Sequence, residues 1–235
     1  MLFLADRIAE SVEILRMYEP PEGYYLAFSG GKDSVVLYAM AQEAGVKFDA
    51  HYNILPDPPE LIRFIREVYP SVKIERPSET MWQLVPRKCY PPTRMARYCC
   101  EALKERGGEN RIVLTGVKHS DSASRRQWLV RSCQKKGKVV VNPLLNWCDD
   151  EIWDYIHESN IPYCSLYNEG LTRLGCVMCP LAGPDRQRKD GERWPQIKKA
   201  WLHAFGRMLE ERKKRGKETQ WNTPEEVMSW WLKED

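Results

Sequence analysis

Blocks of apolar residues with two different spacings run through the first two thirds of the chain. Residues 2–18 carry apolar side chains at helical spacing, and the pattern ends at Pro20-Pro21 and Gly23. Short continuous apolar runs indicate buried strands at 24–28, 46–54, 72–75, 111–116 and 138–142. Helical patterns lie between them, at 33–44, 59–69, 96–106 and 149–159. This alternation predicts an α/β fold with a mostly parallel twisted sheet flanked by helices.

The pattern changes near residue 185, where the chain becomes basic and rich in tryptophan. Residues 185–235 carry 13 basic and 10 acidic side chains, whereas residues 1–184 carry 23 of each. We therefore expect one domain over 1–184 and a basic, Trp-containing helical C-terminal extension over 185–235. The basic excess fits either a solvated helical face or a weak nucleic-acid contact surface. We expect the tryptophans to pack on the core rather than to stack on bases.

Composition and the first residues indicate the class of protein. The 235-residue chain has 43% hydrophobic and 29% charged residues, which is typical of a soluble globular protein. No apolar run approaches the roughly 20 residues that a membrane span needs. The start, MLFLADRIAESVEIL, is acidic and lacks the basic region and cleavage site of a secretion signal. We expect a cytoplasmic protein that contacts no membrane.

A glycine-rich turn follows the first expected strand. Its residues are Ser29, Gly30, Gly31, Lys32, Asp33 and Ser34. The glycines let the backbone approach a phosphate, the next helix offers free N–H groups, and Lys32 adds positive charge. The usual P-loop does not fit, because Leu26 and Asp33 stand where its first glycine and its hydroxyl residue belong. An aspartate in an anion site is expected where Mg²⁺ accompanies the phosphates, and an ordinary Gly-rich βα turn is the alternative.

The turn and several later stretches together resemble one known family. SGGKDS resembles the S-G-G-x-D-S signature of PP-loop ATP pyrophosphatases, in the form typical of the phosphoadenosine phosphosulfate (PAPS) reductase family. Further matches follow in order: PE and FI within 59–65, LTGVKH with Ser122 and Arg125, NPLLNW at 142–147, and IPY and NEG within 161–170. The resemblance implies an adenine nucleotide alpha-hydrolase-like fold with the nucleotide over the carboxyl ends of the strands.

The resemblance also implies which side chains hold and process the nucleotide. Its contacts would come from the turn residues Ser29 to Ser34 and from Asn53, Gly116 and Arg125. The candidate catalytic residues are Lys32, Asp33, Lys104, Lys118 and Arg125, with ATP and Mg²⁺ as the expected ligands. The sequence departs from sulfonucleotide reductases at Asn53, where they often have Asp, and at Lys118-His119, which replace paired arginines. The C-terminal E-C-G-x-H segment of those reductases has no match, since no cysteine follows Cys179.

Eight cysteines are many for a chain expected in the cytoplasm, and they indicate metal or redox chemistry. The pair Cys99-Cys100 and the pair Cys176-x-x-Cys179 resemble the ligands of a [4Fe-4S] cluster in assimilatory adenylyl-sulfate reductases, where a lysine corresponds to Lys104. Divergent side chains of adjacent cysteines suit a cluster better than a zinc ion, and zinc or no metal are the alternatives. We expect the other four cysteines to be small buried residues: Cys89, Cys133, Cys148 and Cys164.

Two enzymatic functions remain open. The first is an ATP pyrophosphatase that adenylates an acceptor for sulfur transfer, as in tRNA thiolation or DNA phosphorothioation. Its partners would be a sulfur donor such as a cysteine desulfurase and a nucleic acid bound by the basic extension. The second is an adenylyl-sulfate or PAPS reductase, in which another cysteine, such as Cys89, replaces the C-terminal nucleophile. A cluster-carrying subunit is a third class, and the oligomeric state stays open, with a homodimer as one arrangement.

Overall fold

The chain forms two compact units in a computed structural model that describes residues 4–133 and 137–233. Unit 1 comprises Met1–Asn53, Pro59–Glu75 and Gly107–Leu174. Unit 2 comprises Ile54–Pro58, Arg76–Arg106 and Gly175–Asp235. Each unit is therefore assembled from segments that are far apart in the sequence, and each is described below by itself.

Unit 1 is built on a six-stranded sheet with the order β3-β2-β1-β4-β6-β5. The strands are β1 (Tyr24–Ala27), β2 (Phe48–Asn53), β3 (Lys73–Glu75), β4 (Ile112–Leu114), β5 (Arg131–Cys133) and β6 (Val139–Val141). All neighbouring strands pair in parallel except β5, which runs antiparallel to β6. The mostly parallel sheet is as predicted. The sequence patterns did not indicate β5, because Arg-Ser-Cys is short, polar and largely exposed at the edge.

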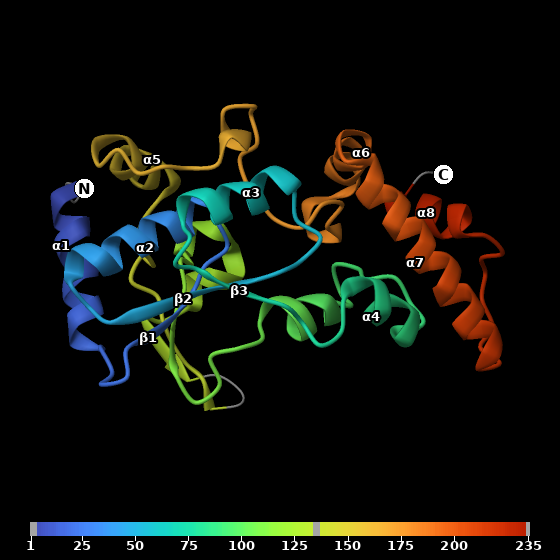
Figure 1. The fold of residues 1–235 in the computed structure, drawn as a ribbon, viewed down its shortest axis with the longest axis horizontal. Helices are drawn as coiled ribbons and strands as arrows, with labels where there is room; N and C mark the ends of the chain where they lie inside the picture. Colours follow the sequence, from blue (N-terminus) through green and yellow to red (C-terminus); the bar gives the residue numbers. More distant parts are fainter. Residues whose placement is uncertain (1–3, 134–136, 234–235) are drawn as a thin grey trace. The chain divides into compact units, whose positions relative to one another are not determined.

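Four α-helices connect and cover the strands of unit 1. They are α1 (Leu4–Met17), α2 (Lys32–Ala44), α3 (Pro59–Val68) and α5 (Asp149–Glu158), with short 3₁₀ turns η2 (His119–Asp121), η3 (Ala123–Gln127) and η5 (Ser165–Tyr167). Helices α1, α2 and α5 pack against one another (Figure 1). The core lies between strand and helix: Leu26 of β1 and Val35, Leu37 and Met40 of α2 have no exposed surface.

The order of the strands places a ligand site at one point of the sheet. From β1 the chain passes through β2 to β3 on one side, and it then returns to the other side of β1 as β4. The chain therefore continues toward opposite sides of the sheet after β1 and after β4, and the two loops start at the carboxyl ends of adjacent parallel strands. Open α/β sheets bind their ligands in this crevice. The turn Ser29–Ser34 and the stretch Gly116–Lys118 both begin there.

Unit 2 is mostly helical. It contains α4 (Met81–Lys88), one π-helical turn η1 (Cys100–Lys104), the 3₁₀ turn η6 (Pro180–Ala182), α6 (Pro184–Arg193), α7 (Pro195–Lys214) and α8 (Pro224–Leu232). Helix α7 packs against α4, α6 and α8, and Figure 1 shows α7 and α8 side by side. Trp201 and Trp231 form the centre, with ring centroids 4.7 Å apart and both rings buried. These two tryptophans pack in the core as expected, whereas Trp230 is 37% exposed.

Helix α4 has no counterpart among the expected elements, because Pro86 lies inside it. A proline lacks the N–H group that would bond to the carbonyl oxygen four residues earlier. That oxygen belongs to Trp82, and here it accepts a hydrogen bond from the Arg207 guanidinium on α7. A residue 125 positions away thus replaces the missing helical donor, and no local pattern can reveal this.

The compact units differ from the expected division at residue 184. Residues 185–235 do not stand apart as an extension, because α7 packs on α4 and both belong to unit 2 with the cysteine-bearing segments. The expected helix over 96–106 is also shorter, with regular helical turns only from Tyr98 to Lys104. In the described part of the chain, no helix is both long and apolar enough to cross a membrane.

Candidate nucleotide and cysteine sites

The glycine-rich turn joins β1 to the first turn of α2. Gly30 has φ +71°, and a Cβ atom there would lie 2.7 Å from Leu61 Cδ1 and 2.8 Å from Ile65 Cδ1. Only glycine therefore fits between the turn and α3 in this backbone conformation. Gly31 is the N-cap residue of α2 and is extended, with φ −78° and ψ 161°. The two glycines bring the backbone close to the helix N-terminus, where N–H groups face an incoming anion.

Hydroxyl groups line this turn. Ser34 Oγ donates a hydrogen bond to the Gly31 carbonyl (2.8 Å) and lies 3.2 Å from Ser29 Oγ. The backbone N–H of Lys32 donates to the Tyr167 hydroxyl at 2.8 Å. Tyr167 thus occupies a hydrogen-bonding position at the start of α2 that a phosphate oxygen could take over. The sequence patterns did not identify Tyr167 as a site residue, because it lies 135 positions away.

The loop after β4 approaches α2 through Gly116. A Cβ atom on Gly116 would lie 2.9 Å from the Asp33 carbonyl oxygen, which is closer than side chains normally come to backbone. Gly116 therefore permits the loops after β1 and β4 to touch at the switch point. Its expected role as a nucleotide contact is compatible with this position.

Two lysines and three aspartates form one ion-pair network at this point. Lys118 has no exposed surface, and its Nζ contacts Asp33 Oδ1 and lies 3.3 Å from Asp121 Oδ1 and 3.2 Å from Asp149 Oδ1. Lys32 is 5% exposed, with its Nζ 3.2 Å from Asp149 Oδ1 and 3.5 Å from Asp33 Oδ2. The network thus joins the turn, the loop after β4 and the N-terminus of α5.

The network shifts the pKa values of Lys118, Asp121 and Asp149 toward their charged forms. Burial disfavours the Lys118 ammonium, but the nearby carboxylates, Asp33 first among them, raise its pKa above the usual value. Burial likewise opposes ionisation of Asp121 and Asp149, yet the pull of Lys118 lowers the pKa of both. Lys118, Asp121 and Asp149 are thus charged near neutral pH, and the Lys118 ammonium can exchange a carboxylate partner for a phosphate.

Arg125 and Asn53 were also expected near the nucleotide. Arg125 lies in η3, forms an ion pair with Asp121, and stacks over the Trp128 ring at 5.7 Å from its centroid. Arg125 is therefore linked to Lys118 through a shared carboxylate. Asn53 is the last residue of β2, at the carboxyl end of the sheet. Asp121 and Asp149, by contrast, are members of the network that the sequence patterns missed.

The two cysteine pairs come together in unit 2. Cys99 and Cys100 lie at the start of η1, and Cys176 and Cys179 flank a tight turn before η6. The Cys99 and Cys100 side chains are hydrogen-bonded to each other. Cys176 and Cys179 lie near enough to Cys99 and Cys100 to interact with them electrostatically. All four are free thiols of intermediate exposure. Two segments that are far apart in the sequence, at 99–100 and 176–179, thus supply one cluster of thiols.

Positive side chains accompany these thiols. The hydrogen bond from Cys99 lowers the pKa of the Cys100 thiol, although burial opposes this, and Arg97 lowers it further. Burial raises the pKa values of Cys176 and Cys179, while Lys104 acts in the opposite direction on both. Lys104 therefore lies within electrostatic range of three of the four sulfur atoms. Arg97 is an additional neighbour that the sequence patterns did not single out.

The chemistry of the donor set fits an iron–sulfur cluster, because four thiols with nearby cations converge. Among residues 4–133 and 137–233, no group of three or more His, Cys, Asp or Glu side chains could hold a metal ion as the side chains stand. Of the other cysteines, Cys89 and Cys164 are buried as expected. That expectation was wrong for Cys133 and Cys148, which are exposed in the edge strand β5 and at the start of α5.

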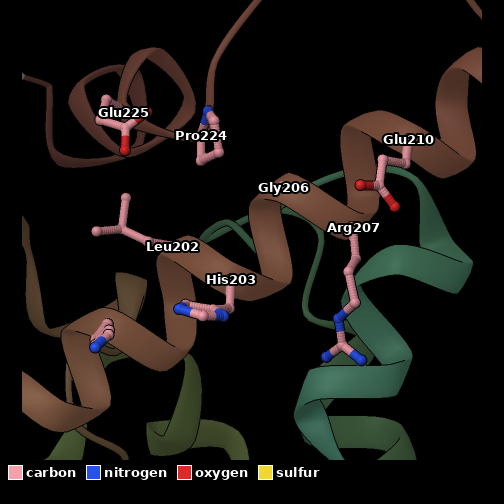
Figure 2. Close-up of a pocket in the computed structure, with 8 residues that line it drawn as sticks. Leu202, His203, Gly206, Arg207, Glu210, Pro224 and Glu225 are labelled. Atoms are coloured by element: carbon pink, nitrogen blue, oxygen red, sulfur yellow. The ribbon is translucent and has the colours of Figure 1, made fainter.

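A shallow pocket in unit 2 lies between α7 and the start of α8 (Figure 2). Its lining residues are Lys199, Leu202, His203, Gly206, Arg207, Glu210, Pro224 and Glu225. Figure 2 shows Arg207 extending from α7 toward α4, where it bonds to the Trp82 carbonyl. The pocket contains none of the expected site residues, and its one arginine already serves the packing of α4.

The fold and the site define an α/β protein in which a Gly-Gly-Lys turn stands at the switch point of a mostly parallel sheet, where such sheets bind their ligands. Residues 23–182 match the phosphoadenosine phosphosulfate reductase domain, and this range is more than half of the chain. The chain therefore belongs to the phosphoadenosine phosphosulfate reductase family. This family was the one indicated by the motifs.

Relatives and solved structures agree with this membership. The chain is 23% identical over 213 residues to adenosine 5'-phosphosulfate reductase 2 of Bacillus subtilis, covering 81% of this chain and 87% of that protein. It is 25% identical over 196 residues to an uncharacterized protein of Methanocaldococcus jannaschii, MJ0066, covering 77% of this chain but only 41% of that longer protein.

Two kinds of solved enzyme share the fold. A Candida auris phosphoadenylyl-sulfate reductase superposes with a TM-score of 0.53 and 19% identity, covering 74% of this chain and 93% of that one. A Candida glabrata FMN adenylyltransferase superposes with a TM-score of 0.53 and 20% identity, covering 74% of this chain and 64% of that one. The fold is therefore adenine nucleotide alpha-hydrolase-like, and it is shared by enzymes with different reactions.

Proposed function

We propose that this chain is an ATP pyrophosphatase that adenylates an acceptor for sulfur transfer. The observation that carries the proposal is the complete SGGKDS turn with Asp33 held between Lys32 and Lys118. A carboxylate among these cations suits a turn that binds ATP with Mg²⁺ and releases pyrophosphate, because Mg²⁺ binds through one or two carboxylates together with substrate phosphates.

Unit 1 supplies the groups that such a reaction needs. The N–H groups at the start of α2 and the ammonium groups of Lys32 and Lys118 would bind the phosphates. Asp33 would be the ligand of Mg²⁺, which binds proteins through one or two carboxylates together with substrate phosphates and neutralises charge on the leaving group.

The first step joins the acceptor to AMP. An oxygen of the acceptor attacks the α-phosphorus, the bond from that phosphorus to the bridging oxygen of the β-phosphate breaks, and pyrophosphate leaves. In the second step a sulfide-level sulfur nucleophile attacks the activated atom and AMP leaves. Neither of these two steps changes an oxidation state. If a cysteine desulfurase is the donor, its persulfide sulfur must first accept two electrons from a pair of thiols, which become a disulfide, to reach the sulfide level. Positioning and charge neutralisation account for most of the rate enhancement in reactions of this type.

The four thiols of unit 2 are proposed to hold a [4Fe-4S] cluster. Cys99, Cys100, Cys176 and Cys179 would be its ligands, with Arg97 and Lys104 offsetting the negative charge of the thiolates. When bound, such a cluster supplies a site for electron transfer or for an additional sulfur ligand. The absorbance spectrum of protein purified without oxygen tests whether a cluster is bound, since an iron–sulfur cluster absorbs near 400 nm and zinc does not.

A nucleic acid is proposed as the acceptor. Unit 2 carries 20 basic and 14 acidic residues, whereas unit 1 carries 16 and 19. Positive charge concentrated in one unit favours a polyanion. The partly exposed rings of Tyr90 and Trp230 contact each other at 5.7 Å between centroids and offer surfaces for stacking on bases.

Reduction of a sulfonucleotide is the second candidate, and the reductases among the relatives favour it. A reductase needs a thiolate that can reach the substrate sulfur. Cys89 was the candidate, but it is only 1% exposed and caps the end of α4. Cys133 and Cys148 are exposed and are better candidates for that role.

A paired assay separates the two functions. Protein purified without oxygen is given ATP and Mg²⁺, or adenylyl sulfate and reduced thioredoxin, and pyrophosphate and sulfite are measured. The proposal expects pyrophosphate from ATP in the presence of acceptor. Sulfite from adenylyl sulfate without any pyrophosphate would assign the reductase reaction instead.

A further inference from the structure

The turn between Cys176 and Cys179 is held from outside through the backbone groups of its two middle residues. Val177 N–H donates to the Pro56 carbonyl at 2.8 Å, and the Val177 carbonyl accepts from Trp201 Nε1 at 3.4 Å. Met178 N–H donates to Asp190 Oδ2 at 3.0 Å, and its carbonyl accepts from Gln187 Nε2 at 3.1 Å. Inside the turn, Cys179 N–H donates to the Cys176 carbonyl at 3.3 Å.

The side chains that hold Met178 are themselves buried. Asp190 is 5% exposed and Gln187 is 2% exposed, and both project from α6. Burying a carboxylate and an amide is costly unless they are hydrogen-bonded. Arg186 Nε bonds to the second oxygen of Asp190, so that this carboxylate has partners at both oxygens.

Met178 itself adopts an unusual backbone conformation. Its φ is +62°, in the left-handed region that residues with a side chain rarely occupy, and its side chain is fully buried. Helix α6 reaches the Met178 side chain at Gly191, where a Cβ atom would lie 3.3 Å from the Met178 sulfur. Such a conformation persists only where the surroundings hold it.

We infer that Asp190 and Gln187 are positioning residues that hold the Cys176–Cys179 turn in the shape in which both sulfur atoms can bind a cluster. The inference rests on the proposed cluster and concerns residues that the cysteine pattern does not include. In metal sites, the loss of a group that orients a ligand typically lowers metal affinity about 10- to 100-fold. Here the oriented group is the backbone between two ligands.

The test compares three variants of the full chain. Asp190→Ala leaves the Met178 N–H without its acceptor, and Gln187→Met removes only the donor to the Met178 carbonyl while keeping the size of the side chain. Asp185→Ala is the matched control, because Asp185 lies on the same helix and pairs with Arg188 but has a 90% exposed side chain. After reconstitution with iron and sulfide, loss of absorbance near 400 nm to an iron chelator is timed. Exchange of the Met178 and Cys179 amides is measured in the iron-free protein.

We expect both α6 variants to lose iron about 10- to 100-fold faster than the wild type, and the control to match the wild type. The Met178 amide should exchange faster in Asp190→Ala, with amides of α7 unchanged. Unchanged iron loss in both variants, or a wild type that binds no iron, overturns the inference. Pyrophosphate release from ATP is followed in the same preparations. Its absence in a wild type that retains iron counts against the proposed reaction alone.

Discussion

At the scale of single residues, Lys118 is the centre of the ion-pair network at the proposed nucleotide site. Its ammonium group is fully buried and lies among three carboxylates, Asp33, Asp121 and Asp149. Such an ion pair is weak evidence for net stability, but removing one partner leaves unpaired charge behind. Removing Lys118 should therefore cost more unfolding free energy than removing one partner of an exposed ion pair.

Lys118→Met should therefore destabilise the protein strongly. We expect a loss of about 3 kcal/mol, at the lower end for buried pairs because Asp149 keeps contact with water. The measurement is chemical denaturation at pH 7. The control is Lys73→Met, which breaks a pair between Lys73 and Asp49 in which the lysine side chain is 60% exposed, and which should cost at most about 1 kcal/mol. Equal effects of the two substitutions would contradict the account.

The same network predicts how stability depends on pH. The folded-state pKa values of Asp121 and Asp149 lie below the usual 3.8, so their ionised forms stabilise the folded state at pH values above about 3.8. This contribution is lost as the pH falls through the lowered folded-state values. Unfolding free energies of the wild type should thus drop as the pH falls below about 3.8. In Lys118→Met the drop should be shallower, and an identical slope in both proteins would remove Lys118 as its cause.

At the scale of elements, the turn after β1 depends on close packing against α3. Gly30 and Gly45 have nearly the same positive φ, +71° and +70°, but only Gly30 has neighbours within 4 Å of an added Cβ atom. The pair therefore separates backbone strain from steric conflict.

Gly45→Ala should cost about 1–2 kcal/mol from strain alone. Gly30→Ala should cost clearly more, because its Cβ would also displace Leu61 and Ile65, and it should weaken ATP binding by moving the turn. Denaturation and nucleotide titration of both variants measure the two effects. A Gly30→Ala protein as stable as Gly45→Ala would show that α3 does not restrain the turn.

The sequence alone was sufficient for the elements whose signals are local. The strand–helix alternation predicted the parallel strands and α2, α3 and α5, and the SGGKDS turn predicted the position of Lys32 and Asp33. The sequence did not predict helix α4, because Arg207 replaces the hydrogen-bond donor that Pro86 lacks. It did not identify Asp149 and Tyr167 as site residues, because only the folded chain brings them to α2. The predicted domain boundary at residue 184 was placed at a change in composition. The compact units of the structure are instead defined by packing, such as that of α7 on α4.

At the scale of the whole molecule, charge is divided between the units. Unit 2 has an excess of six basic residues, and unit 1 has an excess of three acidic residues. The net charge of the whole chain is only +3, but the positive charge is concentrated in unit 2, which favours binding of a polyanion there.

Single-stranded nucleic acid should consequently bind in a salt-dependent manner. If about four phosphates are contacted, affinity should fall roughly 50-fold between 50 and 200 mM salt, following the slope for single strands. Trp230→Ala should weaken binding further by about 1–3 kcal/mol through lost stacking. Fluorescence anisotropy of a labelled nucleic acid provides the measurement. Trp201 is buried and stays unchanged in both proteins, so that only the exposed ring of Trp230 differs between them. An affinity that does not change with salt concentration, or no detectable binding, would exclude a nucleic acid as the acceptor.

The central claim is that Asp33 serves the release of pyrophosphate from ATP. The most direct measurement is pyrophosphate release by the wild type, by Asp33→Asn and by a control variant, Asp150→Asn, with Mg²⁺ and acceptor present. Asp150 is an exposed aspartate of α5, so this control removes a carboxylate outside the ion-pair network. We expect release by the wild type and the control, and a rate about 10²- to 10³-fold lower for Asp33→Asn with ATP still bound. Undiminished release by Asp33→Asn, or none by the wild type under any acceptor tested, would contradict the account.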